Sequence, residues 1–113
     1  TPEEASILAE AGAHVIASHV GSTKGGTIGA KTSLTLEEAA EISQKIFDAA
    51  RKVNKEVILF AHGGPIEGPK EVEYIFKNTD AQGFTGGSAA ERMPIEKAIY
   101  EVTKAYKNIP INK

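Results

Sequence analysis

The feature that most constrains the fold is an alternation of amphipathic helical segments with short runs that are apolar on both faces. Two such runs lie at 13–20 and 56–62, and a weaker one lies at 82–86. Strands without a polar face are typical of parallel sheets, because helices cover both faces of such sheets. The order of one helix followed by three strand–helix units therefore predicts an α/β protein whose parallel sheet is built by right-handed crossovers.

Capping patterns locate the helices along the chain. A threonine followed three residues later by glutamate has the spacing of a capping box, and this pattern begins at Thr1 and at Thr35. With Gly12 standing where a left-handed cap belongs, the two boxes predict helices over 2–11 and 36–54. Prolines at positions 69 and 94 open two further helices. The last of these carries an apolar stripe at helical spacing: Ile95, Ala98, Ile99, Val102, Ala105 and Tyr106.

Three parallel strands make a poor independent sheet, because both faces of a parallel sheet need helices and its two edges need partners. The first helix also has no preceding strand to pack against, so the core is expected to be incomplete. A (β/α)8 barrel needs about 250 residues. We therefore expect residues 1–113 to be the C-terminal segment of a single TIM-barrel domain, made of the last three βα units and the helix before them. The missing N-terminal half of the barrel, or self-association, would complete the core. A three-layer α/β sandwich of few strands is the alternative.

Composition excludes several classes of partner. The chain has 13 basic and 15 acidic residues and a net charge of −2, so it lacks the excess of basic residues expected of a protein that binds nucleic acid or an anionic membrane surface. No apolar run approaches the roughly 20 residues that a membrane span needs. The sequence contains no cysteine, which fits a reducing compartment and leads us to expect a cytoplasmic protein.

Glycine-rich loops follow the predicted strands, and a parallel topology brings them to the end of the sheet where barrel active sites lie. The first and longest begins after Val20 and precedes the helix at 36–54. Loops this long are usually functional or mobile, so we interpret it as a lid or a substrate wall; a solvated surface loop is the alternative. It carries two lysines suited to an anionic substrate and three glycines that allow hinge-like backbone angles: Lys24, Lys31, Gly25, Gly26 and Gly29.

The other two loops, HGGP at 62–65 and GGSAAER at 86–92, occupy the usual phosphate-binding place of a barrel. Ser88 and Glu91 have capping-box spacing, so a one-turn helix is expected to begin beside the glycines with its free amides toward the site. Glycines that serve only tight turns, and a pairing of Glu91 with Arg92 or capping of the turn by these residues, are the alternatives. The predicted binding residues for a phosphate or carboxylate group are Gly63, Gly64, Gly86, Gly87 and Ser88, with Arg92 or Lys31 offsetting developing charge.

His19 and His62 each end a strand just before glycines, so both are expected at the mouth of the barrel. A neutral imidazole there can transfer protons near pH 7 or polarise a carbonyl, which makes the two residues candidates for general acid–base catalysis, with Glu91 as a third candidate. A metal site of the same three residues is a weaker interpretation, because they lie on three loops without tight spacing. Packed core histidines are the alternative, and His14 is expected to be structural or exposed.

Three segments together resemble one family: SHVGSTKGGTIGAKTSLTLEEAAE, HGGPI and GFTGGSAAERMPIEKAI. They are similar to the C-terminal part of the phosphoenolpyruvate hydrolase-like TIM barrels, also called TIM-barrel signal transduction proteins. A similar domain forms the C-terminal portion of plant tobamovirus-resistance proteins. The residues that match are His19, the segment 25–31, His62 to Pro65 and Gly86 to Arg92.

The resemblance implies kinship with the phosphoenolpyruvate mutase and isocitrate lyase superfamily, whose members commonly use Mg²⁺ to steady an enolate or phospho-enol substrate. It implies a hydrolase or lyase that acts on a small phosphorylated or α-keto acid. The metal carboxylates of that superfamily lie on earlier strands, so any Mg²⁺ would be held by residues absent from this chain, which alone is expected to be inactive. A non-catalytic regulatory or protein-interaction domain that keeps the barrel is the competing hypothesis.

Overall fold

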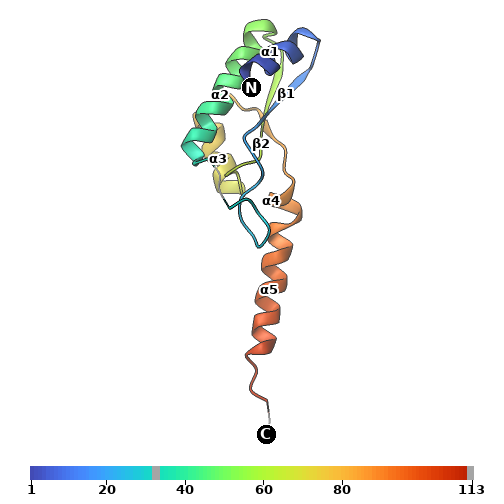
Figure 1. The fold of residues 1–113 in the computed structure, drawn as a ribbon, viewed down its shortest axis with the longest axis vertical. Helices are drawn as coiled ribbons and strands as arrows, with labels where there is room; N and C mark the ends of the chain where they lie inside the picture. The colour runs from blue at the N-terminus through green and yellow to red at the C-terminus, as the bar shows by residue number, and fades with distance from the viewer. Residues whose placement is uncertain (32–33, 112–113) are drawn as a thin grey trace.

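A computed structural model describes residues 1–31 and 34–111, which form helices and one small parallel sheet (Figure 1). The strands lie in the order β1-β2-β3, and both strand pairs are parallel, as the alternating pattern predicts. The α/β class is confirmed; the sheet is compatible with part of a barrel, and the barrel itself stays a prediction. The elements are α1 (Pro2–Glu10), β1 (Val15–His19), α2 (Leu36–Val53), β2 (Ile58–His62), α3 (Pro69–Asn78), β3 (Gly83–Phe84), α4 (Ser88–Glu91) and α5 (Met93–Lys107).

Local capping determines where the first two long helices begin, and both predicted capping boxes are formed. At α2, the backbone N–H of Glu38 donates to the Thr35 hydroxyl at 3.1 Å, and the Thr35 N–H donates back to the Glu38 carboxylate at 2.8 Å. Gly12 follows α1 with a φ of +94°, which confirms the left-handed cap predicted there. Each box satisfies N–H groups that the first turn of a helix leaves unpaired.

The strands are shorter than the apolar runs suggest, and β3 is reduced to two residues. Backbone pairing nevertheless continues past the ends of β3, because Gln82 donates to the Leu59 carbonyl at 2.7 Å and Thr85 donates to the Ala61 carbonyl at 3.0 Å. The position of the strand predicted at 82–86 is therefore confirmed, although the residues on either side of β3 lack regular strand geometry.

The helices cover only one face of the sheet. Ile16 and Ser18 of β1 are buried on that face, whereas the alternate residues of β1 are exposed. In β2, Leu59 and Ala61 are fully buried, while Ile58 remains 43% exposed on the opposite side. No described element covers this second face, which we call the open face: Val15, Ala17, His19, Ile58, Phe60 and His62.

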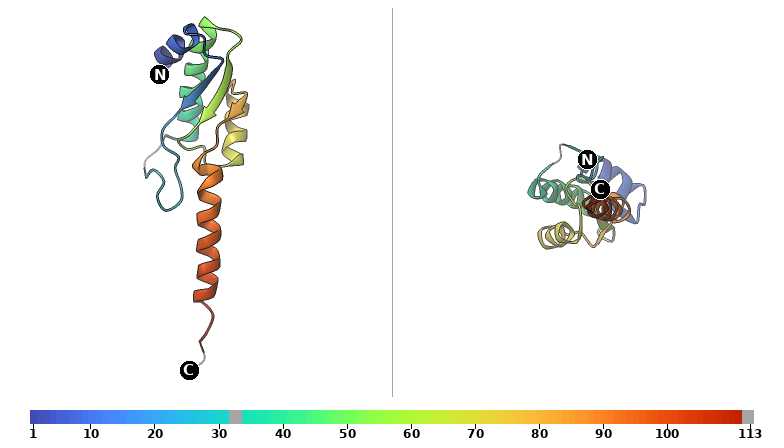
Figure 2. Two further views of the ribbon diagram at one scale, coloured as in Figure 1. Left: turned by 90° about the vertical axis from the view of Figure 1, so that its right-hand side faces the viewer. Right: turned by 90° about the horizontal axis from the view of Figure 1, so that it is seen from below.

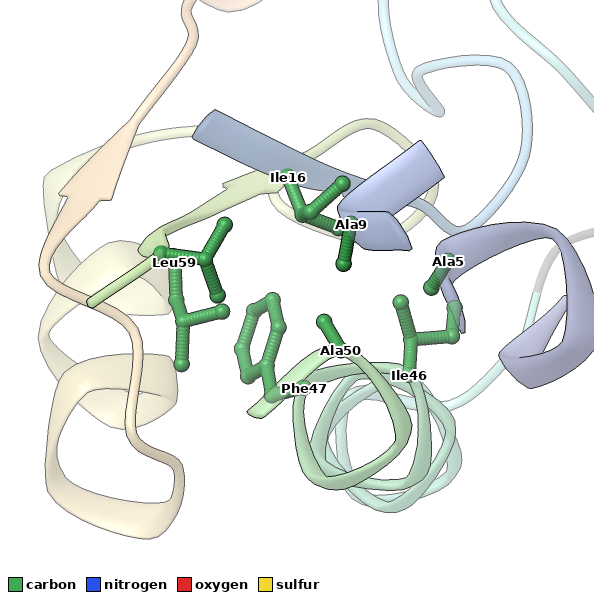
Figure 3. Packing of buried hydrophobic residues seen from close by; sticks show 8 residues of the cluster. Ala5, Ala9, Ile16, Ile46, Phe47, Ala50 and Leu59 are labelled. Atoms are coloured by element: carbon green, nitrogen blue, oxygen red, sulfur yellow. The ribbon is translucent and has the colours of Figure 1, made fainter. Parts of the chain in front are cut away.

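Phe47 is the centre of the main hydrophobic core (Figure 3). Its ring is fully buried between α2, the sheet and α1, where the small side chains of Ala5 and Ala9 let the two helices approach closely. Burying a side chain of this size stabilises the fold by about 1.5–3 kcal/mol. A second cluster joins α2 and α3 to the carboxyl ends of the strands, so these ends are held in place: Val20, Ala39, Ala40, Ala61, Ile66 and Ile75.

Helix α5 projects away from the sheet and its covering helices (Figures 1 and 2). The described chain measures 72 × 22 × 22 Å, and α5 accounts for much of its length. No residue of α5 is buried. The predicted apolar stripe is helical but uncovered, with Ile95, Ile99 and Tyr106 exposed by 58, 60 and 71%. Within the described residues, no helix combines the length and hydrophobicity needed to cross a bilayer.

Candidate functional site

His19 and His62 lie side by side at the carboxyl ends of β1 and β2. The register of the parallel pair sets them opposite each other, and their ring centroids are 4.9 Å apart in an edge-to-face arrangement. Both belong to the open face, with His19 exposed and His62 half-buried. The structure thus brings together the two histidines that end the predicted strands, whereas His14 lies exposed ahead of β1.

Backbone groups orient both imidazole rings through Nδ1. The N–H of Gly21 donates to His19 Nδ1 at 3.3 Å. Nδ1 of His62 lies 2.7 Å from the carbonyl oxygen of Thr85, which can only accept a hydrogen bond. Each ring therefore keeps Nε2 as the nitrogen that is not used for orientation.

The HGGP turn after β2 packs closely on the chain that leaves β1. Gly63 and Gly64 have φ values of +81° and +59°, and a Cβ on Gly64 would lie 2.5 Å from the Val20 carbonyl oxygen. The Gly64 N–H donates to the Gly21 carbonyl at 2.7 Å, and the Lys24 N–H donates to the Gly64 carbonyl at 3.0 Å. The predicted use of the Gly64 amide for an anion is therefore not supported by its contacts, which favour the alternative of a tight turn.

The third loop forms the expected one-turn helix, but the predicted capping box is wrong. Helix α4 spans Ser88–Glu91 with Gly87 as its N-cap, so Ser88 is already the first helical residue and stands one position too late to cap. The amides of Ala90 and Glu91 both donate to the Gly87 carbonyl at 2.9 Å. Glu91 is exposed, and a Cβ on Gly87 would meet no atom within 4 Å, so this loop is open to solvent around its glycine.

Arg92 holds the long glycine-rich loop instead of facing the histidines. Both of its terminal nitrogens lie 3.2 Å from the Gly25 carbonyl oxygen, and one is 3.0 Å from the carboxylate of Glu96. The second oxygen of Glu96 accepts from the Thr27 N–H at 3.0 Å. We call these contacts the Arg92–Glu96 latch. They replace the pairing of Arg92 with Glu91 that the sequence left open, and they leave Arg92 engaged rather than free for a substrate.

Glu96 is the one member of this latch that the sequence interpretation overlooked. The hydrogen bond from the Thr27 amide, and then the one from Arg92, hold the pKa of Glu96 below its usual value. The Arg92 and Glu96 side chains are only 19% and 24% exposed. The i, i+4 spacing of Glu96 from Arg92, the N-cap of α5, was the available signal, because residues four apart are neighbours on a helix surface.

The Arg92–Glu96 latch holds the loop after Val20, which the sequence predicts to be a lid or substrate wall, against the start of α5. Gly25 and Gly26 have φ values of +89° and +70°, and side chains at these positions would collide with residues around the start of α5. Their conformational freedom is therefore used for close docking in this structure. Lys24 and Lys31 are both exposed, and within residues 1–31 and 34–111 no contact holds either side chain at the histidine pair.

Two further observations describe the surroundings of the histidine pair. Among the residues that the structure describes, no three histidine, aspartate or glutamate side chains lie close enough to hold a metal ion, so His19, His62 and Glu91 do not form the metal site considered above. A cavity of about 210 Å³ is lined by residues of β1, among them Ile16, Ala17 and His19, together with residues of α1 and Ile46 of α2.

Comparison with known proteins finds one matching family and several much longer relatives. The profile of the family described as phosphoenolpyruvate hydrolase-like matches residues 1–109. The chain is 46% identical to the ToMV susceptible protein tm-1(GCR26) and 45% identical to the ToMV resistance protein Tm-1(GCR237), both from Solanum lycopersicum; 96% of this chain aligns with 14% of each. It is 34% identical to y4pA of Sinorhizobium fredii, provisionally named a transcriptional regulatory protein, over 96% of this chain and 18% of that protein. The chain thus spans less than a fifth of these relatives.

Proposed function

Because the chain belongs to the phosphoenolpyruvate hydrolase-like family, we propose that it is the C-terminal part of a TIM-barrel enzyme acting on a small phosphorylated or α-keto acid. The observation that carries this proposal is the pair of histidines, whose rings lie 4.9 Å apart at the carboxyl ends of two parallel strands. Barrel enzymes build their active sites at this end of the sheet, and paired imidazoles supply general acid–base chemistry there.

Completion of the barrel explains the open face of the sheet. Val15 and Ile58 are paired across the strands on this face, and they are 45% and 43% exposed. In a barrel such residues point inward and are covered by the remaining strands. In this proposal a preceding strand pairs with the free edge of β1, next to the cavity whose lining includes Ile16, Ala17 and His19. The length of the curated relatives, of which this chain covers 14–18%, leaves ample sequence for those strands.

The substrate anion would lie against backbone amides around the histidines. Among the described residues, the N–H groups of Gly63, Gly87 and Ser88 have no hydrogen-bond acceptor. Gly63 is buried, whereas Gly87 and Ser88 are half-buried, so the amides of Gly87 and Ser88 are the accessible donors for a phosphate or carboxylate oxygen. In this proposal, water is excluded from the histidine pair only when the remaining strands cover the open face.

Magnesium does not fit the residues that this chain supplies. Mg²⁺ prefers oxygen ligands in octahedral geometry, whereas the strand ends present the two imidazoles of His19 and His62. If the complete protein uses Mg²⁺, its carboxylate ligands come from outside this chain. No step of the chemistry proposed for the histidines depends on the metal.

The competing proposal is a non-catalytic regulatory or protein-interaction domain. It is favoured by the names of the relatives, one a virus-resistance protein and one provisionally a transcriptional regulatory protein. A barrel that had lost its chemistry would keep the fold and the apolar core around Phe47 but would not need ordered imidazoles at the strand ends. The histidine pair therefore separates the two proposals experimentally.

The test is turnover by the intact protein, screened on phosphoenolpyruvate and short α-keto acids with and without Mg²⁺. We expect His62→Asn to keep the thermal stability of the wild type and to lose on the order of 100 to 10,000-fold in rate, which is the usual contribution of a positioned acid or base. His14→Asn is the matched control, because His14 is exposed and lies outside the pair. Normal turnover by His62→Asn would assign the chemistry to other residues, and a wild type that neither turns over nor binds these acids would favour the regulatory proposal.

A further inference from the structure

The backbone partners of the two histidines are of opposite kinds. His19 Nδ1 faces the N–H of Gly21, which can only donate, and His62 Nδ1 faces the carbonyl of Thr85, which can only accept. In the neutral state one ring nitrogen carries a proton and the other does not. The bonds therefore assign the proton of His19 to Nε2 and the proton of His62 to Nδ1.

Both partners are themselves held by backbone hydrogen bonds. The Gly21 carbonyl accepts from the Gly64 N–H at 2.7 Å, which holds Gly21 against the turn after β2. The N–H of Thr85 donates to the Ala61 carbonyl at 3.0 Å, which holds the Thr85 residue beside β2. The opposite tautomers thus follow from strand pairing and turn geometry rather than from mobile side chains.

We infer that this difference divides the chemistry between the two histidines: unprotonated Nε2 of His62 accepts the substrate proton, and Nε2–H of His19 donates a hydrogen bond to the substrate oxygen. The inference rests on the function proposed above. Gly21 and Thr85 are positioning residues that act through their backbone groups.

The proton and electrons of such a step balance within one keto acid and the two rings. The C–H bond beside the carbonyl breaks, its proton forms an N–H bond at Nε2 of His62, and its electron pair forms the carbon–carbon double bond of an enolate. The carbonyl π electrons move to the oxygen, which accepts the hydrogen bond from His19 Nε2–H. The resulting His62 imidazolium keeps its Nδ1–H bond to the Thr85 carbonyl.

The same geometry explains why His19 is the donor. A proton added to Nδ1 of His19 would face the N–H of Gly21 and break their hydrogen bond. His19 therefore acts as a neutral ring that polarises the substrate carbonyl and keeps its own proton. The 4.9 Å separation of the ring centroids allows one small acid to contact both residues.

Asparagine and glutamine variants of the intact protein separate the two roles, since an asparagine amide mimics the Nδ1 position and a glutamine amide mimics Nε2. His19→Gln keeps an N–H donor at Nε2, so we expect turnover within about tenfold of the wild type, whereas His19→Asn and both His62 variants fall by roughly 100-fold or more. Rescue by His62→Gln together with loss in His19→Gln would reverse the roles and overturn the inference.

Ring ¹⁵N resonances of histidine-labelled protein test the tautomers without activity. At about pH 8, above the titration of an ordinary imidazole, a protonated and an unprotonated ring nitrogen have well-separated resonances. We expect the Nε2–H tautomer at His19 and the Nδ1–H tautomer at His62, each assigned by its loss in the corresponding Gln variant. The same tautomer in both rings would refute the inference. Opposite tautomers in a wild type that turns over none of the acids would refute the proposed enzyme function and the catalytic roles, while the backbone control of the tautomers would stand.

Discussion

Replacing Gly64 by alanine tests the close approach between the HGGP turn and the chain that leaves β1. The added Cβ would lie 2.5 Å from the Val20 carbonyl oxygen and 3.0 Å from a Val20 methyl carbon, at a φ of +59°. The turn or the strand end must move to accommodate it. Such a movement would strain the two hydrogen bonds of Gly64, one to the Gly21 carbonyl at 2.7 Å and one from the Lys24 N–H at 3.0 Å.

The expected loss of stability is the sum of the backbone strain and the weakened hydrogen bonds. A non-glycine residue in the left-handed region costs roughly 1–2 kcal/mol. Weakening hydrogen bonds whose net contribution is about 0.5–1.5 kcal/mol each raises the loss in the free energy of unfolding to about 2–4 kcal/mol. For a barrel-sized domain this corresponds to a fall in Tm of roughly 5–15 °C. Gly21 would move as well, so we expect that its N–H no longer holds His19 in the Nε2–H tautomer.

Thermal unfolding of the intact protein, followed by circular dichroism, measures the effect. Gly12→Ala is the matched control, because Gly12 also has a positive φ of +94° but a Cβ there would meet no atom within 4 Å. The control should lose only the backbone contribution, roughly 1–2 kcal/mol. Equal falls in Tm for the two variants would show that the contact with Val20 relaxes freely and would refute the reasoning.

Three further predictions concern the core, the latch and assembly. Phe47→Ala should lower the free energy of unfolding by about 3–5 kcal/mol, whereas Ile99→Ala on the uncovered helix should change it by less than about 0.5 kcal/mol in the same denaturant titration; the reverse order would place the core elsewhere. The pKa of Glu96 is lowered in the folded protein, so its carboxylate contributes to the free energy of unfolding. This contribution is fully present above the ordinary pKa of about 4.3 and is lost as the pH falls through the lower pKa of the folded state. The amide resonance of Thr27 should report this loss and should shift at neutral pH in Glu96→Gln; a transition above pH about 4.3 would contradict the assignment. This chain alone should self-associate because its open face is uncovered, and sedimentation showing a compact monomer with a cooperative melt would contradict the barrel-segment hypothesis.

The parts of the fold that the sequence predicts depend on short-range physics. Both capping boxes join residues three positions apart, so their formation at Thr1 and Thr35 needs no tertiary contact. The left-handed residue at Gly12 follows in the same way from the end of α1. The proximity of His19 and His62 was predictable because residues that end neighbouring parallel strands meet at one edge of the sheet.

The errors at the candidate site arise where several local patterns compete. Ser88 and Glu91 have the spacing of a capping box, yet the helix begins one residue earlier, because Gly87 takes the N-cap position and its carbonyl accepts the first hydrogen bonds. The glycines of HGGP fit both an anion site and a tight turn. Only the positions of Val20 and Gly21 show that Gly64 packs against backbone.

The sequence by itself determined the α/β order, the starts of α1, α2 and α3 and the two histidines at the strand ends, because each depends on residues close in the chain or on the periodicity of one element. The tertiary structure alone decided what Arg92 does, since the Gly25 carbonyl that it binds lies 67 positions away and comes within reach only when the long loop meets the start of α5. It also decided the opposite partners of the imidazoles. The donor at His19 comes from two residues along the chain, but the acceptor at His62 comes from Thr85, which reaches the ring through the pairing of β3 with β2.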